Sequence, residues 1–407
     1  MNDSTLNLAV VGAGPVGLAL ALHAARALPQ ATVTLFDARP ADKDVSADPR
    51  ALALSLGSVQ ILERLGAWRA DLAQPILEVH VSQAPPSTFA LLGSWLGEPE
   101  LRIRAVDEVV PLLGAVMHYG GIVAPLQAVW TAAERAEPQR LHSRFGTPVA
   151  ALKNIDGGVE VDAGIAERFD LAVVAEGGVF AEQNRTLPAE QVRPGLRHDY
   201  RQTAWVGQVR FEAGAGPRAP GIAFERFTRH GPAALLPLKD DRAALVWCVA
   251  SDADPVRELS DAQRVAVLNT VFHASVGRIA SVTPLKSFAL GLSAERTLTD
   301  GRTVRIGNAA QTLHPVAGQG LNLGLRDAFE LVSALARNPD VGAVLRQLEW
   351  QRAPDRWAMI FATDFLARSF TWKLPGAGAA RGLGIAALQV LGPLKSAIAR
   401  QMMFGSR

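Results

Sequence analysis

Residues 6–17, Leu6-Asn-Leu-Ala-Val-Val-Gly-Ala-Gly-Pro-Val-Gly17, decide the fold of this chain. Their apolar first half predicts a buried parallel strand, and the leucine- and alanine-rich residues 18–26 predict a helix. A second strand, predicted over 31–36, ends at Asp37, twenty residues after the last glycine. The order of strand, G-x-G-x-x-G turn, helix, strand and acidic residue is typical of a dinucleotide site in an α/β, Rossmann-like domain.

Each glycine of this turn has its own role in that interpretation. Gly12 permits the tight turn, Gly14 lets a pyrophosphate approach the backbone, and Gly17 lets the helix and strand pack closely. Free N–H groups at the start of the helix then bind the anion, and Asp37 accepts hydrogen bonds from the adenosine ribose. The motif alone does not distinguish NAD from FAD, and a glycine-rich turn that binds nothing is the alternative.

The overall composition is that of a folded globular protein. Hydrophobic residues make up 49% and charged residues 20% of the 407 residues, which excludes a disordered chain. The formal net charge is only +2, so the general basic field that binds nucleic acid is missing, and we expect no nucleic-acid partner. The single cysteine, Cys248, excludes an intramolecular disulfide and a cysteine-based zinc site, and is typical of a reducing compartment.

Residues 5–25 are about as long and apolar as a membrane span. A spanning helix would have to contain three glycines and a proline within six positions, which the dinucleotide interpretation explains and the membrane interpretation does not. A signal peptide would carry Lys or Arg ahead of its apolar stretch, whereas Asp3 is the only charge before Arg26. We therefore expect a cytoplasmic protein without a spanning segment.

Two further glycine-rich segments favour FAD over NAD. Residues 169–178 predict a strand that ends in the acid–glycine turn Glu176-Gly177. Residues 303–327 predict a strand and a loop, followed by a helix that begins near Gly320 and runs to about Arg337. An enzyme that only transfers a hydride to or from NAD needs no such additional segments.

These segments resemble the single-component flavin-dependent aromatic hydroxylases, and among them the ubiquinone-biosynthesis hydroxylases. The resemblance is carried by residues 48–55 and 62–68, and above all by residues 307–327. It extends from about residue 6 to residue 404. The spelling Gly307-Asn-Ala-Ala-Gln-Thr-Leu-His-Pro315 is similar to the branch that hydroxylates 2-polyprenyl-6-methoxyphenol.

The resemblance implies an FAD site with defined contacts. Arg50 is expected to contact the cofactor, Asn308 to lie near the ribityl chain and phosphates, and Pro315 with residues 318–322 to border the isoalloxazine ring. Two departures from the family pattern occur: Glu176 replaces an aspartate, and residues 116–121 lack the usual arginine, with only His118 as a substitute. The complete set of expected cofactor-binding residues is Gly12, Ala13, Gly14, Pro15, Val16, Gly17, Asp37, Arg50, Glu176, Gly177, Gly307, Asn308, Pro315, Gly318, Gln319, Gly320, Leu321 and Asn322.

The expected architecture is an FAD-binding Rossmann-like domain, a mixed or antiparallel-sheet substrate domain and a C-terminal helical region. Residues 200–250 alternate short apolar runs with Gly/Pro turns, which predicts an antiparallel sheet. The resemblance implies that this sheet carries the aromatic pocket, at its interface with the 314–322 loop. The expected ranges are 1–75, 101–180 and 281–350 for the FAD domain, 76–100 and 181–280 for the substrate domain, and 351–407 for the helical region.

The chemistry implied by the resemblance needs no metal. NAD(P)H reduces FAD, O2 adds to form a flavin C4a-hydroperoxide, and one oxygen is transferred to an electron-rich phenol carbon of a polyprenylated substrate. A base near the phenol would help, and His314 is the candidate, with a structural hydrogen-bonding histidine as the alternative. His230 is a weaker candidate.

The C-terminal region is basic and partly amphipathic. Residues 351–407 contain eight Lys or Arg and two Asp or Glu, a local charge of +6. Leu388, Leu391, Leu394, Ile398 and Met402 recur at helical spacing, interrupted at Pro393. Such a segment suits the inner membrane surface, the entrance of a prenyl-lipid site, or other ubiquinone-biosynthesis proteins through residues 380–407. A helix packed on the core with a solvated basic edge is the alternative.

Two other functions stay open at this point. The first is a non-catalytic, lipid-presenting or scaffold subunit of the same fold, which the two departures from the family pattern motivate. The second is a hydroxylase of a soluble aromatic compound.

Overall fold

A computed structural model describes residues 5–84, 100–177, 195–214, 216, 219–272, 274–315, 318–369 and 377–405. Parts of the expected substrate domain, residues 85–99 and 181–194, lie outside the described residues. So do residues 370–376 and 406–407 of the expected helical region.

The first sheet confirms the predicted strand–turn–helix–strand unit. Its central strand β1 (Asn7–Val11) pairs in parallel with β2 (Thr32–Asp37) and with β12 (Leu171–Val174), and helix α1 (Pro15–Ala27) follows the glycine turn. The parallel pairing brings the first and second glycine-rich segments to the same edge of the sheet. The remaining strands are β8 (Leu141–Phe145), β19 (Thr299–Asp300) and β20 (Thr303–Arg305).

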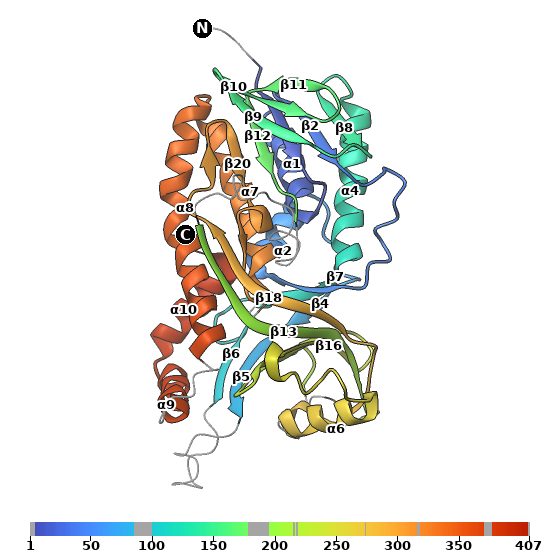
Figure 1. Ribbon diagram of the computed structural model, residues 1–407, viewed down its shortest axis with the longest axis vertical. Coiled ribbons are helices and arrows are strands. Elements are labelled where there is room, and N and C mark those ends of the chain that lie inside the picture. Colours follow the sequence, from blue (N-terminus) through green and yellow to red (C-terminus); the bar gives the residue numbers. More distant parts are fainter. Residues whose placement is uncertain are drawn as a thin grey trace.

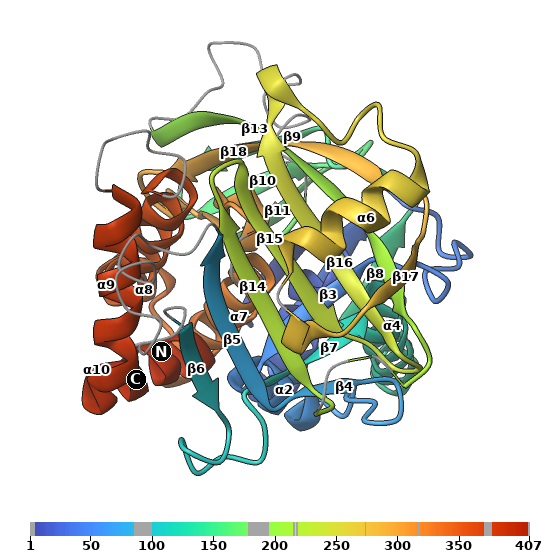
Figure 2. The ribbon, with the colours of Figure 1, turned by 90° about the horizontal axis from the view of Figure 1, so that it is seen from below.

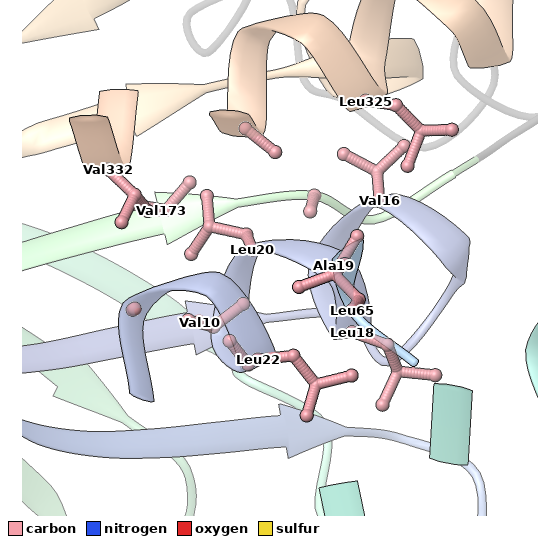
Figure 3. Close-up of a cluster of buried hydrophobic side chains, with 14 of the residues drawn as sticks. Val10, Val16, Leu18, Ala19, Leu20, Leu22, Leu65, Val173, Leu325 and Val332 are labelled. Carbon is pink, nitrogen blue, oxygen red and sulfur yellow. The ribbon is translucent and has the colours of Figure 1, made fainter. Parts of the chain in front are cut away.

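Figure 3 shows how the core of this unit is built from α1, β1, β12 and the helix α7 (Gln319–Arg337). Leu20 of α1 lies between Val10 and Val173 of the strands and Val332 of α7, and all four side chains are fully buried. Burying an aliphatic side chain of this size contributes about 1.5–3 kcal/mol. This packing holds the helices that follow the first and third glycine-rich segments against each other.

The second sheet confirms the predicted antiparallel strands. Its long central strand β13 (Gly195–Phe211) pairs with β16 (Arg242–Ala250) and β18 (Lys286–Glu295), and helix α6 (Asp261–Val271) covers its outer face (Figure 2). One pair is parallel, between β14 (Ile222–Thr228) and β5. The other strands are β5 (Glu78–Ala84), β6 (Glu100–Arg104), β15 (Gly231–Pro237), β17 (Ile279–Val282) and β21 (Gln311–Thr312).

The sheet membership of three strands differs from the expected domain ranges. β6, β18 and β21 fall within the ranges expected for the FAD domain, yet they hydrogen-bond into the second sheet. An apolar alternation predicts a strand but not its partner, because the pairing partner is chosen by tertiary packing. β18 pairs with β13 over most of its length, and this pairing places it in the second sheet.

A small sheet and helix α2 (Leu56–Arg64) lie between the two larger sheets, and helix α4 (Tyr119–Ala136) runs beside the first sheet (Figure 1). This sheet consists of β3 (Ala51–Ser55), β7 (Gly114–His118) and β4 (Gln74–Ile76). Helices α2 and α4 follow β3 and β7 directly. A further sheet lies beside the first one and consists of β9 (Ala151–Ile155), β10 (Gly158–Asp162) and β11 (Ala166–Phe169).

The long helix α8 (Val341–Ser369) runs along the side of the molecule, beside both large sheets (Figure 1). A buried cluster of charges fastens it to α7. Arg352 Nε lies 2.8 Å from Asp327 Oδ1 and Arg352 Nη2 lies 2.8 Å from Asp355 Oδ2, while Arg326 Nη1 lies 3.1 Å from Asp355. Because each of these buried charges has an opposite charge beside it, removing one partner is costly.

The C-terminal helices α9 (Ala377–Val390) and α10 (Gly392–Phe404) meet at a bend of 94°, next to the predicted break at Pro393. The inner face of α10 packs on the core, since Gln401 Nε2 donates to Asp355 Oδ1 at 2.7 Å and a Cβ at Gly57 would lie 2.8 Å from the Met403 carbonyl. No single helix among the described residues is long and apolar enough to cross a membrane. Residues 380–390 and 392–404 reach that length and composition only as a bent pair.

Candidate functional site

Two of the three glycines in the first turn are required by neighbouring backbone. Gly12 has a φ of 104°, and a Cβ there would lie 2.9 Å from the Glu176 nitrogen. A Cβ at Gly17 would lie 1.8 Å from the Gly12 carbonyl oxygen. Among the described residues, a Cβ at Gly14 would meet only the Tyr119 hydroxyl, at 3.8 Å, so this glycine has the open space that a bound pyrophosphate needs.

The start of α1 offers backbone donors for an anion. Gly14 is the N-cap and provides no side-chain cap, and the first turn contains no acidic residue. The first N–H groups of a helix have no intrahelical acceptor, and the helix dipole places a partial positive charge there. A phosphate group beside Gly14 would accept hydrogen bonds from these N–H groups and would be attracted by the partial positive charge.

The three glycine-rich segments, far apart in the sequence, meet around α1. Glu176 of the second segment lies against Gly12, and the side chain of Ala175 lies against Gly17. The third segment approaches from the other side, since a Cβ at Gly324 would lie 2.8 Å from Val16 Cγ2 and 2.9 Å from the Cα of Gly307. The structure thus brings the three segments that the sequence analysis selected together around α1, and the surface that they share is called the groove below.

Asp37 lies at one end of this groove and already has protein partners. Its carboxylate accepts hydrogen bonds from the Ala13 N–H at 2.6 Å and from Arg39 Nε at 2.9 Å. Burial alone would raise the pKa of Asp37, but the hydrogen bonds from Arg39 and Ala13 outweigh it and the pKa is lowered. Asp37 and Arg39 line a small hollow together with Pro40 and Lys43, at the place expected for the adenosine. The sequence analysis missed Arg39.

The segment 116–121, which lacks the family's arginine, contributes a tyrosine instead. The Tyr119 hydroxyl is the group nearest to Gly14, and the Arg50 guanidinium lies 4.2 Å from the centre of the Tyr119 ring. A hydrogen bond to Asp48 raises the pKa of Arg50, and Tyr119 adds to the shift. His118, the expected substitute, places its Nδ1 3.0 Å from the Pro49 carbonyl oxygen. Tyr119 could have been found as the first residue of the helix that follows β7.

Glu176 and Gly177 lie exposed on the surface of the groove. Neighbouring protein atoms partly desolvate the Glu176 carboxylate, which raises its pKa, and the negative charge of Asp37 adds to the increase. The positive charge of Arg305 lowers the pKa by a smaller amount. Apart from its chain neighbours, no atom of the described residues lies within 4 Å of a Cβ built at Gly177. Both residues are therefore accessible to a ligand in the groove.

The third segment turns sharply before α7. Gly318 is the N-cap in the left-handed conformation, with a φ of 58°, and the first turn of α7 has neither a side-chain cap nor an acidic residue. The Asn322 side chain fixes this loop, because its Oδ1 accepts from the Ser55 N–H at 2.8 Å and its Nδ2 donates to the carbonyls of Ala53 and Gly318 at 3.0 Å. Asn308 Oδ1 lies 3.4 Å from a Cβ built at Gly320, so Asn308 stands beside the start of α7.

A largely apolar cavity of about 140 Å³ opens between this loop and the second sheet. Pro315, Gly318 and Gln319 form its wall on the side of the groove. The buried Oε1 of Gln319 has no hydrogen-bond partner among the residues that the structure describes. The other walls come from the second sheet, the small sheet and α10, with the side chains Ile76, Val79, Ile103, Leu113, Ala223, Phe224, Glu225, Ala234, Leu236, Val246, Ala399, Met402 and Met403. The wall contributed by α10 was not predicted in residue detail.

The two candidate histidines lie outside the lining of this cavity. His314 is buried with Nε2 3.1 Å from Gln202 Oε1 and its ring edge-to-face with Tyr200, and burial lowers the pKa of His314 to about 3. This geometry favours the structural alternative for His314, and an acid–base role stays a prediction. His230 lies in the exposed turn between β14 and β15, where Arg229 Nε donates to its Nε2 at 3.2 Å.

The groove fits FAD by its donor groups and its shape. The N-termini of α1 and α7, which have no side-chain caps, face it, and Gly14 leaves room for a phosphate. Gln319 Oε1, beside the cavity, can accept a hydrogen bond from a ligand. Among the residues that the structure describes, no group of three or more His, Cys, Asp or Glu side chains is placed to hold a metal ion.

Comparisons with known proteins point to the same cofactor. The FAD dependent oxidoreductase family matches residues 7–219, and the FAD binding domain family matches residues 188–360. The crystal structure of Klebsiella pneumoniae HpxO complexed with FAD and uric acid superposes with a TM-score of 0.69, covering 98% of this chain and 97% of that chain. At 16% identity this likeness shows the fold alone.

Two enzymes are similar to this chain over nearly its whole length. Ubiquinone hydroxylase UbiL of Rhodospirillum rubrum is 32% identical over 423 residues, covering 98% of this chain and 90% of that protein. 3-Demethoxyubiquinol 3-hydroxylase of Escherichia coli is 30% identical over 407 residues, covering 97% of both.

Proposed function

Because this chain belongs to the FAD-dependent hydroxylases of ubiquinone biosynthesis, we propose that its substrate is a polyprenylated phenol, and specifically 2-polyprenyl-6-methoxyphenol. The chain is a monooxygenase that uses FAD and NAD(P)H. The specific phenol is supported only by the spelling of residues 307–315. The Escherichia coli relative is named for a different compound, 3-demethoxyubiquinol, which is the competing substrate.

The observation that supports a phenolic lipid is the position of the cavity. Its apolar walls suit an aromatic ring and the first isoprene units of a prenyl chain, because burying apolar surface is favourable. Pro315 and Gln319, which the resemblance places beside the isoalloxazine ring, form one of its walls. A ring bound in this cavity would therefore lie next to the reactive part of the cofactor.

FAD supplies the redox chemistry when it is bound, since it accepts the hydride of NAD(P)H and activates O2. The protein contributes binding and shielding. Backbone N–H groups at the start of α1 would hold the pyrophosphate, and the positive dipole end at the N-terminus of α7 would stabilise the negative charge of reduced flavin. The apolar cavity excludes water from the reacting carbon. The route of oxygen transfer expected from the resemblance stays a prediction.

The non-catalytic alternative was motivated by Glu176 and by residues 116–121. Glu176 lies against Gly12, and Tyr119 lies near Gly14, so both departures leave polar groups along the groove. The hydroxylase of a soluble aromatic compound differs from our proposal only in the substrate.

Hydroxylation of a short-chain analogue tests the proposed activity. FAD-loaded protein, NAD(P)H and O2 should convert 2-geranyl-6-methoxyphenol to a product heavier by one oxygen atom, detected by mass spectrometry. A Gly14→Val variant is the control, because a side chain there fills the space expected for the pyrophosphate. The proposed substrate would be contradicted if the protein hydroxylated a short soluble phenol but oxidised NAD(P)H without hydroxylating any prenylated phenol.

The natural substrate can be identified in cells. A strain that lacks this protein should accumulate 2-polyprenyl-6-methoxyphenol if the 307–315 spelling indicates the reaction correctly. Accumulation of 3-demethoxyubiquinol instead would reassign the chain to the reaction for which the Escherichia coli relative is named.

We further propose that the protein is cytoplasmic and binds the inner face of the membrane through the bend between α9 and α10. Val390, Leu391 and Leu394 are exposed at this bend, and Lys395 lies next to them. A second exposed apolar turn, with Val106 and Val109, lies close by, because Ser396 Oγ of α10 donates to Glu108 Oε1 at 2.8 Å. The inner face of α10 lines the cavity, so a lipid could pass from the bilayer along this helix.

Vesicle binding tests the membrane proposal. The wild type should sediment with vesicles of phosphatidylethanolamine and phosphatidylglycerol, and the double variant Leu391→Ser, Leu394→Ser should stay in solution. Leu72→Ser removes an exposed leucine elsewhere and serves as the control. Equal sedimentation of the double variant and the wild type would leave another biosynthetic protein as the partner of this surface.

A further inference from the structure

The cavity has four polar side chains among its described lining residues, and two of them are used to hold the fold. Ser55 caps α2 by accepting from the Ser58 N–H. The Asn322 amide bonds Ser55, Ala53 and Gly318. The remaining two, Glu225 and Gln319, lie in opposite walls of the cavity, Glu225 on the second sheet and Gln319 on the loop beside the groove.

Glu225 is the single charged side chain among the described residues that line the cavity. It lies in the middle of β14, where the pairing of the strands puts Ala234 on one side and Val81 on the other. Burial raises the pKa of the neighbouring Cys248 thiol, and the negative charge of Glu225 adds to the shift. Glu225 is half-buried and also has interactions within the protein. It is nevertheless a charged side chain in a largely apolar wall, so it offers a polar contact to a ligand in the cavity.

The polar groups of the cavity are complementary to a ligand that donates a hydrogen bond. Glu225 is acceptor-only when ionised, and the buried Gln319 Oε1 is an acceptor for which the described part of the chain provides no donor. A phenolic hydroxyl is a donor on an otherwise apolar ring, which matches an apolar cavity with a carboxylate in its wall. A carboxylate has about four acceptor positions, so Glu225 can bind the hydroxyl in addition to any protein partner.

We propose, on the basis of the proposed function, that Glu225 accepts the hydrogen bond of the substrate's phenolic hydroxyl and thereby sets the orientation of the ring. A hydrogen bond to an ionised acceptor is about twice as strong as a neutral one, and it is directional. Because Glu225 lies on the sheet and Pro315 on the opposite loop, a ring held by its hydroxyl presents its other carbons toward the groove. Glu225 is in this account a substrate-binding residue that determines specificity for phenols.

The proposal predicts how the protein distinguishes a phenol from its methyl ether, which has lost the donor. The FAD-loaded wild type should bind 2-prenyl-6-methoxyphenol about ten-fold more tightly than its methyl ether, measured by equilibrium dialysis. Glu225→Leu should bind both compounds equally, because the acceptor is gone. Glu225→Gln keeps one carbonyl oxygen at the same place and should retain part of the preference.

Glu212→Leu is the matched control, because it removes an exposed carboxylate that pairs with Arg278 at the edge of the same sheet. It should keep the preference of the wild type. A Glu225→Leu variant that retains FAD and still prefers the phenol about ten-fold would overturn the proposal. If Glu225→Leu loses FAD, the comparison of phenol and methyl ether in the wild type still tests the proposal. Equal binding of the two compounds by the wild type would overturn it.

Binding and turnover separate this inference from the proposed function. A wild type that prefers the phenol, loses this preference with Glu225→Leu and forms no hydroxylated product would support the role of Glu225 and contradict the proposed reaction. Product formation together with an unchanged preference in Glu225→Leu would support the reaction and overturn the role of Glu225.

Discussion

The two ends of the site are built by different means. At the nucleotide end, the backbone defines the groove, because Gly12 and Gly17 lie within contact distance of other main-chain atoms and tolerate no side chain. At the cavity end, side chains from the second sheet and from α10 define the space, and Met402 or Val246 could be exchanged for other apolar residues of similar volume. A site of the first kind leaves a motif in the sequence, whereas a site of the second kind does not.

The largest effect is expected within the first turn, where Gly17 is enclosed by backbone and Gly14 faces open space. Gly17→Val forces a side chain into the Gly12 carbonyl and should abolish both FAD retention and the native fold. Gly14→Val meets only the Tyr119 hydroxyl among the described residues, so the protein should fold with the melting temperature of the FAD-free wild type but retain less than about a tenth of the flavin. Flavin absorbance per protein and thermal unfolding measure the two properties separately.

A valine at Gly384, where a Cβ meets no protein atom within 4 Å, is the control for both variants and should change neither property. Wild-type flavin occupancy in Gly14→Val would contradict the position of the pyrophosphate.

The second effect concerns the joint between the two ends, where the buried charges connect α7, α8 and α10. Asp355→Asn removes the carboxylate that pairs with Arg326 and one of the two that pair with Arg352, and it should lower the free energy of unfolding by about 3–5 kcal/mol. Urea denaturation measures this loss. Asp107→Asn, which breaks an exposed ion pair with Arg104, should leave the denaturation midpoint unchanged, and a similarly small loss for Asp355→Asn would refute the role of the joint.

The third effect is a pH dependence of stability that originates at His314, next to the loop that links the two ends. The unfolded chain protonates His314 near its ordinary pKa of 6.5, whereas the folded chain does so only near a pKa of about 3. Between these values the unfolded state binds more protons, so stability falls with decreasing pH by up to about 1.4 kcal/mol per pH unit.

His314→Gln removes this titration. The difference in unfolding free energy between wild type and variant should therefore change by about 2 kcal/mol from pH 7 to pH 5, measured by urea denaturation at each pH. A difference that is constant over this range would mean that His314 is solvated and titrates normally.

The smallest effect tests how firmly α10 closes the cavity. A Cβ at Gly57 would lie 2.8 Å from the Met403 carbonyl, so Gly57→Ala should push α10 away from α2 at a cost of about 1 kcal/mol. FAD retention should stay unchanged, while amide hydrogen exchange over residues 392–404 should increase. Unchanged exchange in this helix would show that α10 adapts to the methyl group without loosening.

Most of the first sheet and of the groove could be predicted from the sequence, and the reasons are local. The G-x-G-x-x-G turn, the acid at position 37 and the third glycine-rich segment each combine a strand, a turn and a helix within a short stretch. The antiparallel pairing of β15 and β16 also followed from local turns.

The cavity could not be predicted in the same way. Glu225 is one of many carboxylates in the sequence, and only the register of β14 turns it toward the loop that contains Pro315. Tyr119 approaches Gly14 through tertiary packing that no spacing rule records. Arg39 bonds Asp37 from two residues along the chain, a local contact that the dinucleotide motif does not specify. His314 was selected for its place beside Pro315, but the next residue along a chain can point to the opposite side, and it points toward Gln202.

The central claim is that the cavity and the cofactor groove form one site, and a flavin absorption titration tests it most directly. Addition of 2-geranyl-6-methoxyphenol to the FAD-loaded protein should shift the visible flavin bands, because Pro315, Gly318 and Gln319 border both the cavity and the expected position of the isoalloxazine ring. The shift should saturate at the same phenol concentration as binding measured by equilibrium dialysis. Saturable phenol binding without any change in the flavin bands would place the substrate away from the cofactor and contradict the account.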